Sequence, residues 1–392
     1  MASALHDRAA SVVATHRTEL LELSHQLHRD PELSFEEHRS AAAVAALLEQ
    51  AGFSVVRQAY GLDTAFTATA GHGAFHVGVF AEYDALPGVG HACGHNVIAA
   101  AAVGAALALA DVADDADLTV VVLGTPAEER GGGKILMAER GALDSLHAAV
   151  MVHPWPTERL EATCLAVDQF DVTFTGLEAH AAAAPWEGTN AADAMVVAQV
   201  ALGLLRQQLQ PGDLVHGIVT DGGAAANVIP GSVTGSFMVR APRADRLADV
   251  RRRVEACFAA GALATGCTVE IVDLAPAYSH MVSDPDLLAA YRRSAEALGR
   301  HFDLDDAGAP KPMISTDMAN VSLAVPSIHP MLKVEAHGAV NHQPDFAAAC
   351  ASDSADLAVT DGAVAMAWTV LEVVGDPGVR ARLLERGPQR TN

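Results

Sequence analysis

The chain has 392 residues, of which 51% are hydrophobic and 19% charged, and its formal net charge is −23. The apolar fraction excludes a disordered chain, and the length predicts about two domains with a large core. The acidic balance argues against a nucleic-acid partner, because phosphates bind to basic surfaces. The five cysteines form no CxxC pair, which indicates free or metal-binding thiols in a reducing cytoplasm rather than disulfides.

The sequence predicts no membrane span. The longest apolar run, Val97–Ala110, is shorter than the roughly 20 residues needed to cross a bilayer. The N-terminal segment carries charges throughout and lacks the apolar core of a signal peptide. We therefore expect a cytoplasmic protein that has no membrane partner.

The first part of the chain alternates between strands and helices. Apolar periodicity predicts helices over Ser11–His28 and Glu36–Gln50. Apolar runs without clean alternation predict strands that are buried on both faces, at Phe75–Phe80, Leu118–Leu123 and Ala148–Val152. A further helix, Val97–Ala110, lies between the first two strands. This βαβ order predicts a three-layer α/β domain with a mostly parallel sheet.

From about Gln169 the pattern changes to β-α-β-β-α-β, which is typical of a ferredoxin-like domain. The predicted elements are strands at Gln169–Thr175, Asp213–Thr220, Ser232–Arg240 and Thr268–Leu274, and helices at Asn190–Gln208 and Ala244–Ala260. The α/β pattern then returns with a helix at Asp286–Arg300, a strand at Ser327–Val334 and a last helix at Ser352–Val374. We expect one α/β domain in two parts, 1–168 and 279–392, interrupted by an inserted domain at 169–278.

The densest group of chemically active side chains follows the first buried strand. There His91, Cys93 and His95 are spaced by two residues, at the kind of strand end where open α/β sheets bind ligands. Thiolate, imidazole and carboxylate groups are the natural ligands of zinc-type ions. A buried cysteine between two hydrogen-bonded histidines is the alternative. With Glu82 and Asp84 beside them, the pattern favours a metal site.

Metal-type side chains also follow the next two buried strands. Glu128 and Glu129 come after the second strand, and His153 ends the third. Adjacent carboxylates face different ways, so one can bind a metal while the other acts as a base toward bound water. Each feature alone is equally typical of a charged surface loop or a structural histidine. Because parallel strands bring these ends to one edge of the sheet, the sequence predicts a shared metal site there.

Four further residues are candidates for the same site. In the inserted domain, His180 follows the first strand, Asn227 precedes the third strand and Arg240 ends it. Taken singly, each is more often a surface loop residue or, for Arg240, a solvated strand end, and the alternative is a group that faces a site on the other domain. His342 follows the late strand Ser327–Val334 and adds one more imidazole.

Motifs along nearly the whole chain resemble the di-metal peptidase–amidohydrolase family that contains aminoacylase, carboxypeptidase G and the plant indole-acetyl-amino-acid hydrolases. They are HRDPELSFEE at 28–37, DALPGVGHACGHN at 84–96, GTPAEE at 124–129, VHP at 152–154, AHAAAAPWEGTNAADA at 179–194, NVIP at 227–230 and STDMANVS at 315–322. HACGH together with GTPAEE is highly specific. GHACGHN, the Pro-Trp-Glu-Gly run and STDMANVS most resemble the p-aminobenzoyl-glutamate hydrolase and β-alanyl-dipeptidase branch.

The resemblance implies two divalent ions, zinc or manganese with cobalt as a further candidate. Cys93 matches the position whose thiolate bridges the two metals, and the other implied ligands are His95, Glu129, His153 and His342. His329 and His337 lie near His342, but the HxPxF spacing favours His342. Asn96 departs from the aspartate of the indole-acetyl-amino-acid branch and removes no implied ligand.

The resemblance also implies roles for five residues outside the ligand set. Glu128 matches the general base for metal-bound water, and Asp84 matches the carboxylate that orients a ligand. His180 matches a histidine that, in the family, reaches across a dimer to stabilise the oxyanion. Asn227 and Arg240 fall where the family places substrate-binding groups. The inserted domain would then serve as a lid and dimerisation domain of a homodimer.

The expected function is metal-dependent hydrolysis of an amide bond in an N-acyl or N-aroyl amino acid or a dipeptide, by metal-activated water with Glu128 as general base. A dipeptidase for β-alanyl or basic dipeptides is the alternative within the same chemistry. Two alternatives belong to other classes: a non-catalytic metal-binding protein on the same fold, and a structural α/β protein. The expected partner is a small amide or dipeptide substrate.

Overall fold

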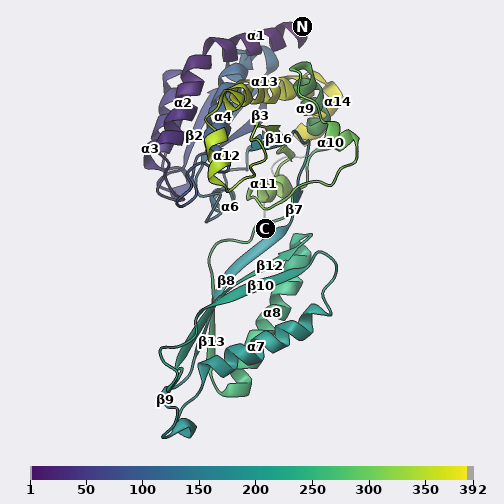
Figure 1. Ribbon diagram of the computed structural model, residues 1–392. Coiled ribbons are helices and arrows are strands. Elements are labelled where there is room, and N and C mark those ends of the chain that lie inside the picture. The colour runs from purple at the N-terminus through teal and green to yellow at the C-terminus, as the bar shows by residue number, and fades with distance from the viewer. Residues whose placement is uncertain (1, 386–392) are drawn as a thin grey trace. The chain divides into compact units, whose positions relative to one another are not determined.

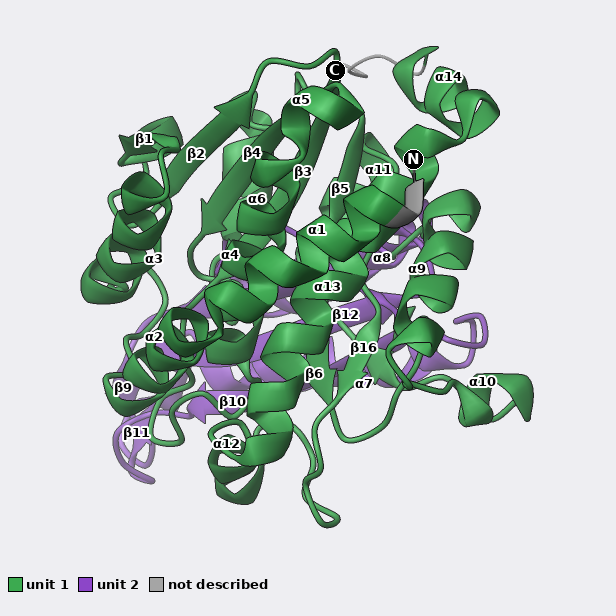
Figure 2. Ribbon diagram, turned by 90° about the horizontal axis from the view of Figure 1, so that it is seen from above, with its two compact units in different colours: residues 1–163, 281–392 green, residues 164–280 purple. Residues whose placement is uncertain are grey.

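The computed structural model describes residues 2–385 and divides the chain into two compact units. The first unit comprises the chain up to residue 163 and from residue 281 onward, and the second is Cys164–His280 (Figure 2). The boundaries expected from the sequence, after 168 and after 278, lie a few residues away from these. Each unit has its own buried apolar core.

A six-stranded sheet in the order β1-β2-β4-β3-β5-β15 forms the centre of the first unit. Figure 1 shows its strands β2 and β3 among the helices, and Figure 2 shows β1, β2, β4, β3 and β5 side by side. The pairs β4–β3, β3–β5 and β5–β15 are parallel. The pairs β1–β2 and β2–β4 are antiparallel. The strands of this unit are β1 (Ser54–Arg57), β2 (Phe66–Gly71), β3 (Phe75–Glu82), β4 (Leu118–Thr125), β5 (Ala148–Val150), β6 (His153–Trp155), β7 (Thr163–Cys164), β14 (Met313–Ile314), β15 (Ser327–Ile328) and β16 (Met331–Lys333). The expected α/β fold with a mostly parallel sheet is confirmed.

Helices cover both faces of this sheet and give three layers. The helices are α1 (Ala2–Thr15), α2 (Arg17–Arg29), α3 (His38–Gln50), α4 (His95–Asp111), α5 (Ala113–Ala116), α6 (Gly133–Glu139), α9 (Pro285–Ala297), α10 (Asp303–Asp306), α11 (Met318–Ala324), α12 (Pro344–Ala349), α13 (Asp353–Gly375) and α14 (Pro377–Glu385), with a 3-10 turn η1 (Ala59–Gly61). Val79 of β3 belongs to the buried cluster that contains residues of α4 and α13, while its neighbour Phe80 belongs to the cluster that contains residues of α6 and α11. The alternation of side chains along a strand thus fills two cores.

Three elements differ from the sequence-based expectations. The helix predicted over Ser11–His28 is two helices, α1 and α2, which meet at His16. The strand predicted over Ala148–Val152 divides into β5 and β6, and the one predicted over Ser327–Val334 divides into β15 and β16. Pro330 lies at the second break, and proline supplies no N–H to a ladder. His153 therefore begins β6 rather than ending a buried strand.

The helix α13 is long and apolar enough to cross a membrane by composition, and 67% of its most apolar window is buried in the protein. It packs against α4 and α9 within the first unit. A core helix of a protein that is not in a membrane passes the same test, so the apolar sequence of α13 is accounted for by packing.

The second unit has the βαββαβ order expected from the sequence. Its sheet, β10-β12-β8-β13, is antiparallel throughout. The elements are β8 (Ala166–Thr175), β9 (Ala179–His180), η2 (Pro185–Glu187), α7 (Ala191–Arg206), β10 (Leu214–Asp221), β11 (Val228–Ile229), β12 (Ser232–Ala241), α8 (Ala244–Thr265) and β13 (Thr268–Asp273). Burial alternates along β12, because the helices cover one face of the sheet. Phe170, Phe237 and Phe258 meet between the two layers.

Close contact between α4 and α13 depends on Gly104. A Cβ atom at this position would lie 2.8 Å from Cβ of Ala363 and 3.0 Å from a methyl carbon of Leu20. We expect Gly104→Val to lower the unfolding free energy by about 1–3 kcal/mol through overpacking. Gly203→Ala in α7, where a Cβ meets open space, is the control and should leave stability equal or slightly higher. Equal thermal midpoints for both variants, measured by circular dichroism, would contradict this packing.

Candidate metal centre

The predicted site residues of the first unit gather at the carboxyl edge of the parallel strands. Asp84 follows β3, Glu128 and Glu129 follow β4, and His153 begins β6. His95 is the first residue of α4, the helix that connects β3 with β4. These separate segments of sequence reach one place because parallel strands end on the same side of a sheet.

The turn before α4 aims Cys93 and His95 at the same point. Gly94, between them, has φ +80°, and a Cβ there would lie 2.7 Å from Cγ of Pro154. Only glycine adopts this left-handed backbone so close to a neighbouring segment without strain. The left-handed turn at Gly94 therefore allows the thiol of Cys93 and the imidazole of His95, two residues apart, to point to the same place.

The structure brings all five predicted metal ligands together in two groups. In one group the donor atoms of Cys93, His95 and His153 lie within 4.8 Å of one another, and in the other those of Cys93, Glu129 and His342 do. The Cys93 Sγ atom is 3.7 Å from His153 Nε2 and 3.5 Å from His342 Nε2. Cys93 belongs to both groups, which is the arrangement of one thiolate shared by two cations.

The choice among the late histidines is decided by the backbone. The N–H of His342 donates to the carbonyl oxygen of Ala92 at 2.9 Å, which holds this residue beside Cys93. His342 has φ +70° and His337 has φ +50°, so backbone strain does not separate these two residues, whereas the bond to Ala92 does. His337 is 89% exposed in its side chain, and His329 is buried with its ring 5.4 Å from that of His153.

Unsatisfied buried atoms test whether a cation fits. Among the described residues, His95 Nε2 and Glu129 Oε1 are buried without a hydrogen-bond partner, although ion-pair contacts of 3.2 Å to Glu82 and 3.8 Å to Glu129 surround His95 Nε2. Such atoms cost free energy unless something binds them. Imidazole, thiolate and carboxylate donors are the set that divalent zinc-type ions take. The residues present therefore fit two divalent cations.

Hydrogen bonds fix the orientation of the imidazoles. Asp84 Oδ1 accepts a hydrogen bond from His95 Nδ1 at 3.0 Å, and His153 Nδ1 donates to the carbonyl oxygen of Pro154 at 2.8 Å. Both rings thus turn Nε2 toward the cluster, as outer-shell partners of metal-binding histidines do. Burial opposes ionisation of Asp84, but the bond from His95 outweighs it and lowers the pKa of Asp84 to about 2.

Glu128 lines a cavity of about 250 Å³, together with the predicted ligands Cys93, Glu129, His153 and His342. Burial, together with the negative charges of Glu82 and Glu129, raises the pKa of Glu128 well above its ordinary value. A carboxylate with a raised pKa accepts a proton at neutral pH more readily than an ordinary one. Its position and its proton affinity suit the role of general base.

The other three predicted residues belong to the second unit. β9 and β11 pair so that His180 is opposite Val228, next to Asn227. His180 Nδ1 accepts hydrogen bonds from the N–H groups of Ala182 and Ala183 at 3.2 Å. In the neutral ring Nε2 then carries the proton, so this atom is a hydrogen-bond donor. Arg240 lies near the end of β12 and is half-buried.

Sequence reasoning missed two charged residues at this site, Lys134 and Asp317. Both are fully buried, and Lys134 bonds to Asp317 and to Glu82. The only signals were the scarcity of lysine, three in the chain, and the STDMANVS motif. Asn96, the departure from the indole-acetyl-amino-acid branch, is buried and donates to Ser24 Oγ and to the carbonyl oxygen of Cys350, so it has a structural role.

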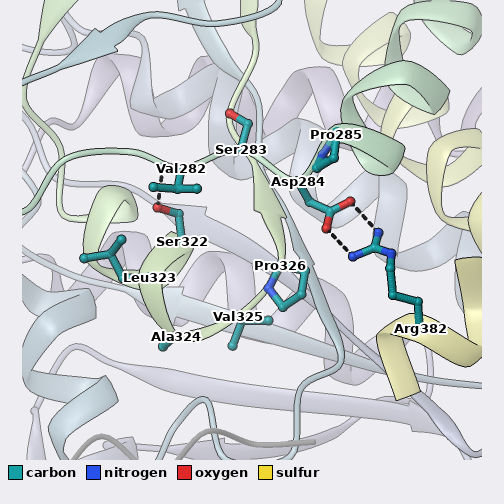
Figure 3. A pocket seen from close by; sticks show the side chains of 10 residues that line it. All are labelled: Val282, Ser283, Asp284, Pro285, Ser322, Leu323, Ala324, Val325, Pro326 and Arg382. Atoms are coloured by element: carbon teal, nitrogen blue, oxygen red, sulfur yellow. Dashed lines mark hydrogen bonds and ion pairs between the residues drawn. The ribbon is translucent and has the colours of Figure 1, made fainter. Parts of the chain in front are cut away.

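A larger cavity of about 530 Å³ in the first unit contains none of the predicted residues (Figure 3). Its polar feature is the ion pair between Asp284 and Arg382, with two contacts of 2.8 and 2.9 Å. Asp284 also caps the N-terminus of α9. These contacts connect α9 with α14, so the charged groups that line this cavity have a structural role.

A model of peptidase family M20/M25/M40 matches residues 78–359 of the chain. The Xaa-Arg dipeptidase of Mus musculus is 40% identical over 389 residues, which cover 96% of this chain and 90% of the relative. A p-aminobenzoyl-glutamate hydrolase subunit of Escherichia coli (strain K12) is 32% identical over 275 residues, 65% of this chain and 57% of the relative. A solved structure of a dinuclear metal binding peptidase from Bacillus subtilis covers 92% of this chain and 99% of its own, with a TM-score of 0.69 and 21% identity.

The chain belongs to peptidase family M20/M25/M40, as its motifs predicted. It is a metal-dependent hydrolase that cleaves amide bonds, and the solved structure shares its fold. The prediction of an enzyme is thereby confirmed against the two non-enzymatic alternatives. Its cofactors are divalent metal ions.

The turn that carries Glu128 rests on buried Glu37. Glu37 Oε1 accepts from the N–H of Ala127 and Oε2 from Thr64 Oγ1, both at 2.8 Å. Ala127 has φ +57°, so this bond stabilises a strained residue directly before the proposed base. Burial, with the charge of Asp84 added, raises the pKa of Glu37 from 4.5 to about 7.

This raised pKa predicts a stability change with pH. The folded protein holds the Glu37 proton more tightly than the unfolded chain, so the contribution is full below pH 4.5 and is lost as pH rises through about 7. The loss amounts to about 3 kcal/mol. Glu37→Gln keeps an acceptor for Ala127 and removes the titration, so its thermal midpoint should fall less than that of the wild type between pH 5 and pH 8. Glu36→Gln, at an exposed neighbour, is the control; an unchanged pH profile in Glu37→Gln would refute the assignment.

Proposed function

We propose that this enzyme is a dipeptidase for dipeptides with a basic C-terminal residue. The observation that carries the proposal is 40% identity to the mouse Xaa-Arg dipeptidase across 96% of the chain. The net charge of −23 is consistent with it, because an acidic surface attracts cationic substrates. Hydrolysis of N-acyl or N-aroyl amino acids is the second candidate, favoured by the similarity to the p-aminobenzoyl-glutamate hydrolase of Escherichia coli.

The proposed cofactors are two zinc or manganese ions. The five ligands would be Cys93, His95, Glu129, His153 and His342, with Cys93 shared between the ions. A thiolate favours zinc, whereas imidazole and carboxylate groups suit both metals. When bound, divalent cations polarise the substrate carbonyl and lower the pKa of water.

The residues of the chain supply the remaining chemistry. Glu128 takes a proton from the attacking water and returns it to the nitrogen of the leaving amine. Asp84 keeps His95 in the tautomer that presents Nε2. His180, whose Nε2 is a donor, stabilises the oxyanion of the tetrahedral intermediate, which is usually a large electrostatic contribution.

The proposal includes a homodimer joined through the second unit. β10 is the edge strand of its sheet, and an edge strand is a template for pairing with another chain. Val196, Val200 and Leu204 are exposed at four-residue intervals on α7 and form an apolar stripe on one helix face. Leu214, Ile218 and Val219 of β10 are exposed as well. A second copy would cover these apolar side chains.

The topology of this unit supports a contribution in trans. Arg240 pairs with Val167 near the start of β8, whereas Ser232 pairs with Thr175 at its end, where the chain continues to β9 and His180. From Ser232 to Arg240 an extended strand spans about 26 Å, and a dipeptide spans only about 7 Å. This separation supports the proposal that His180 and Arg240 of one unit serve different sites, so that two copies would complete each site. A cytoplasmic location, suggested by five cysteines that form no disulfide, completes the proposal.

A hydrolysis screen tests the proposed substrate. With zinc or manganese added, the wild type should release arginine or lysine from basic dipeptides, including β-alanyl dipeptides, faster than it cleaves N-acyl amino acids or p-aminobenzoyl-glutamate. Glu128→Gln, which keeps the shape of the side chain, should bind the metals and lose about 10²–10⁴-fold in kcat. Preference for p-aminobenzoyl-glutamate would favour the second candidate, and near wild-type turnover by Glu128→Gln would refute the base.

Subunit exchange tests the trans role of His180. In a mixed dimer of His180→Ala and Glu128→Gln chains, one site has both an intact base and an intact partner histidine. Equal mixing should therefore restore about a quarter of the wild-type activity from two variants that are each nearly inactive. No gain in activity after verified exchange would show that His180 acts within its own chain.

A further inference from the structure

Lys134, at the start of α6, forms a buried ion triad with Glu82 and Asp317, next to the proposed metal ligands. Its Nζ atom lies 2.5 Å from Glu82 Oε2 and 2.7 Å from Asp317 Oδ1. Asp317 Oδ2 also accepts the backbone N–H of Lys134 at 2.9 Å. All three side chains have no exposed surface. The triad joins the end of β3, the start of α6 and the residue that precedes α11.

The charges of this triad do not balance. Two carboxylates face one ammonium, so Lys134 alone offsets only one of the two carboxylates, and a buried charge is costly without a partner. Glu82 Oε1 is the atom that Lys134 does not hold, and it makes no hydrogen bond with the described residues. This atom lies 3.2 Å from His95 Nε2. The excess negative charge is therefore directed at the cluster rather than away from it.

Glu82 belongs to a third group of donor atoms. The donor atoms of Glu82, His95 and Glu128 lie within 4.8 Å of one another. His95 Nδ1 bonds to Asp84, so Nε2 is the His95 atom left to bind a cation. A cation at Nε2 would have Cys93 and His153 among its neighbours and the Glu82 carboxylate also within reach.

We propose that Glu82 is a further residue that holds the cation bound at His95, and that Lys134 and Asp317 are positioning residues that aim its carboxylate. Lys134 holds Oε2 and so prevents the side chain from rotating away, while Asp317 fixes Lys134 through both its backbone and its ammonium group. The inference rests on the proposed metal centre. It assigns the triad to metal binding rather than to stability alone.

Metal titration of Glu82→Gln tests this role. The variant leaves Lys134 paired with Asp317 and His95 hydrogen-bonded to Asp84, so both buried cationic groups keep a carboxylate partner and the protein should fold. One of the two cations should bind about 10- to 100-fold more weakly, as after loss of an outer-shell partner, while the other keeps its affinity. The measurement is metal content after dialysis, together with competition against a chromophoric chelator, for zinc and for manganese.

The matched control is Glu158→Gln. Glu158 is also a buried carboxylate of the first unit, and it pairs with Arg300 as Glu82 pairs with Lys134. It accepts from Arg300 Nη1 at 2.8 Å and is in none of the three donor groups. This variant should keep both metal affinities, even if its thermal midpoint falls. A loss of metal affinity in Glu158→Gln as large as that in Glu82→Gln would show a general effect of destabilisation and overturn the proposal.

The neutral variant Glu82→Gln with Lys134→Met and Asp317→Asn guards against misfolding, because replacing a whole buried ion triad is often neutral for stability. It should show the same weakened site as the single variant. Two cations bound with wild-type affinity in either variant would overturn the role of Glu82 and leave the metal centre intact. If the wild type itself bound no divalent cation, both this role and the proposed metal centre would fail.

Discussion

The hydrogen bonds accepted by Asp84 hold the proposed site together. Its Oδ1 accepts from His95 Nδ1, and its Oδ2 accepts from Ser34 Oγ at 2.8 Å and from the N–H of Glu129 at 3.0 Å. One buried carboxylate thereby connects the end of β3, the first residue of α4 and the turn after β4. Because these bonds lie in a desolvated region, they are strong and specific. The positions of the donor atoms of His95 and Glu129 both depend on this residue.

Around Asp84 the site collects more negative than positive charge. Glu82 and Glu128 are buried, the side chain of Glu129 is 7% exposed, and Lys134 is the fully buried lysine beside them. Burial also raises the pKa of the Cys93 thiol well above its ordinary value. Divalent cations bound at the proposed ligands would offset this charge and would require an ionised thiol, so metal binding, proton release and folding would be linked at this edge of the sheet.

The inserted unit sets the distance between His180, the proposed oxyanion donor, and Arg240, a proposed substrate-binding group. A ferredoxin-like sheet with long central strands, β8 and β12, separates His180 from Arg240 by most of the length of a strand. Its edge strand β10 and the apolar stripe on α7 offer a surface for a second copy. In the proposed dimer the same strands that build the core of the unit would determine which chain contributes each group to a site.

Sequence periodicity was sufficient for the order of most of the elements, and the resemblance to a family supplied the five proposed ligands. Buried strands are recognisable by their apolar runs, and polar residues at their ends stand out against that background. The strands β1 and β2 were missed, because Ser54–Arg57 is largely exposed and Phe66–Gly71 is rich in threonine, alanine and glycine. The choice of His342 over His337 came from a motif, and the structure supports it by the contact with Cys93.

The sequence by itself determined the family, the α/β and inserted ferredoxin-like pattern and the residue types at each strand end. Only the tertiary structure decided that His153 begins a separate ladder after a break, and that Lys134 pairs with Glu82 and Asp317. Pattern along a chain reports how one element is buried, whereas these contacts join segments 52 and 183 residues apart. Their proximity results from how the helices and strands pack, and no local periodicity encodes it.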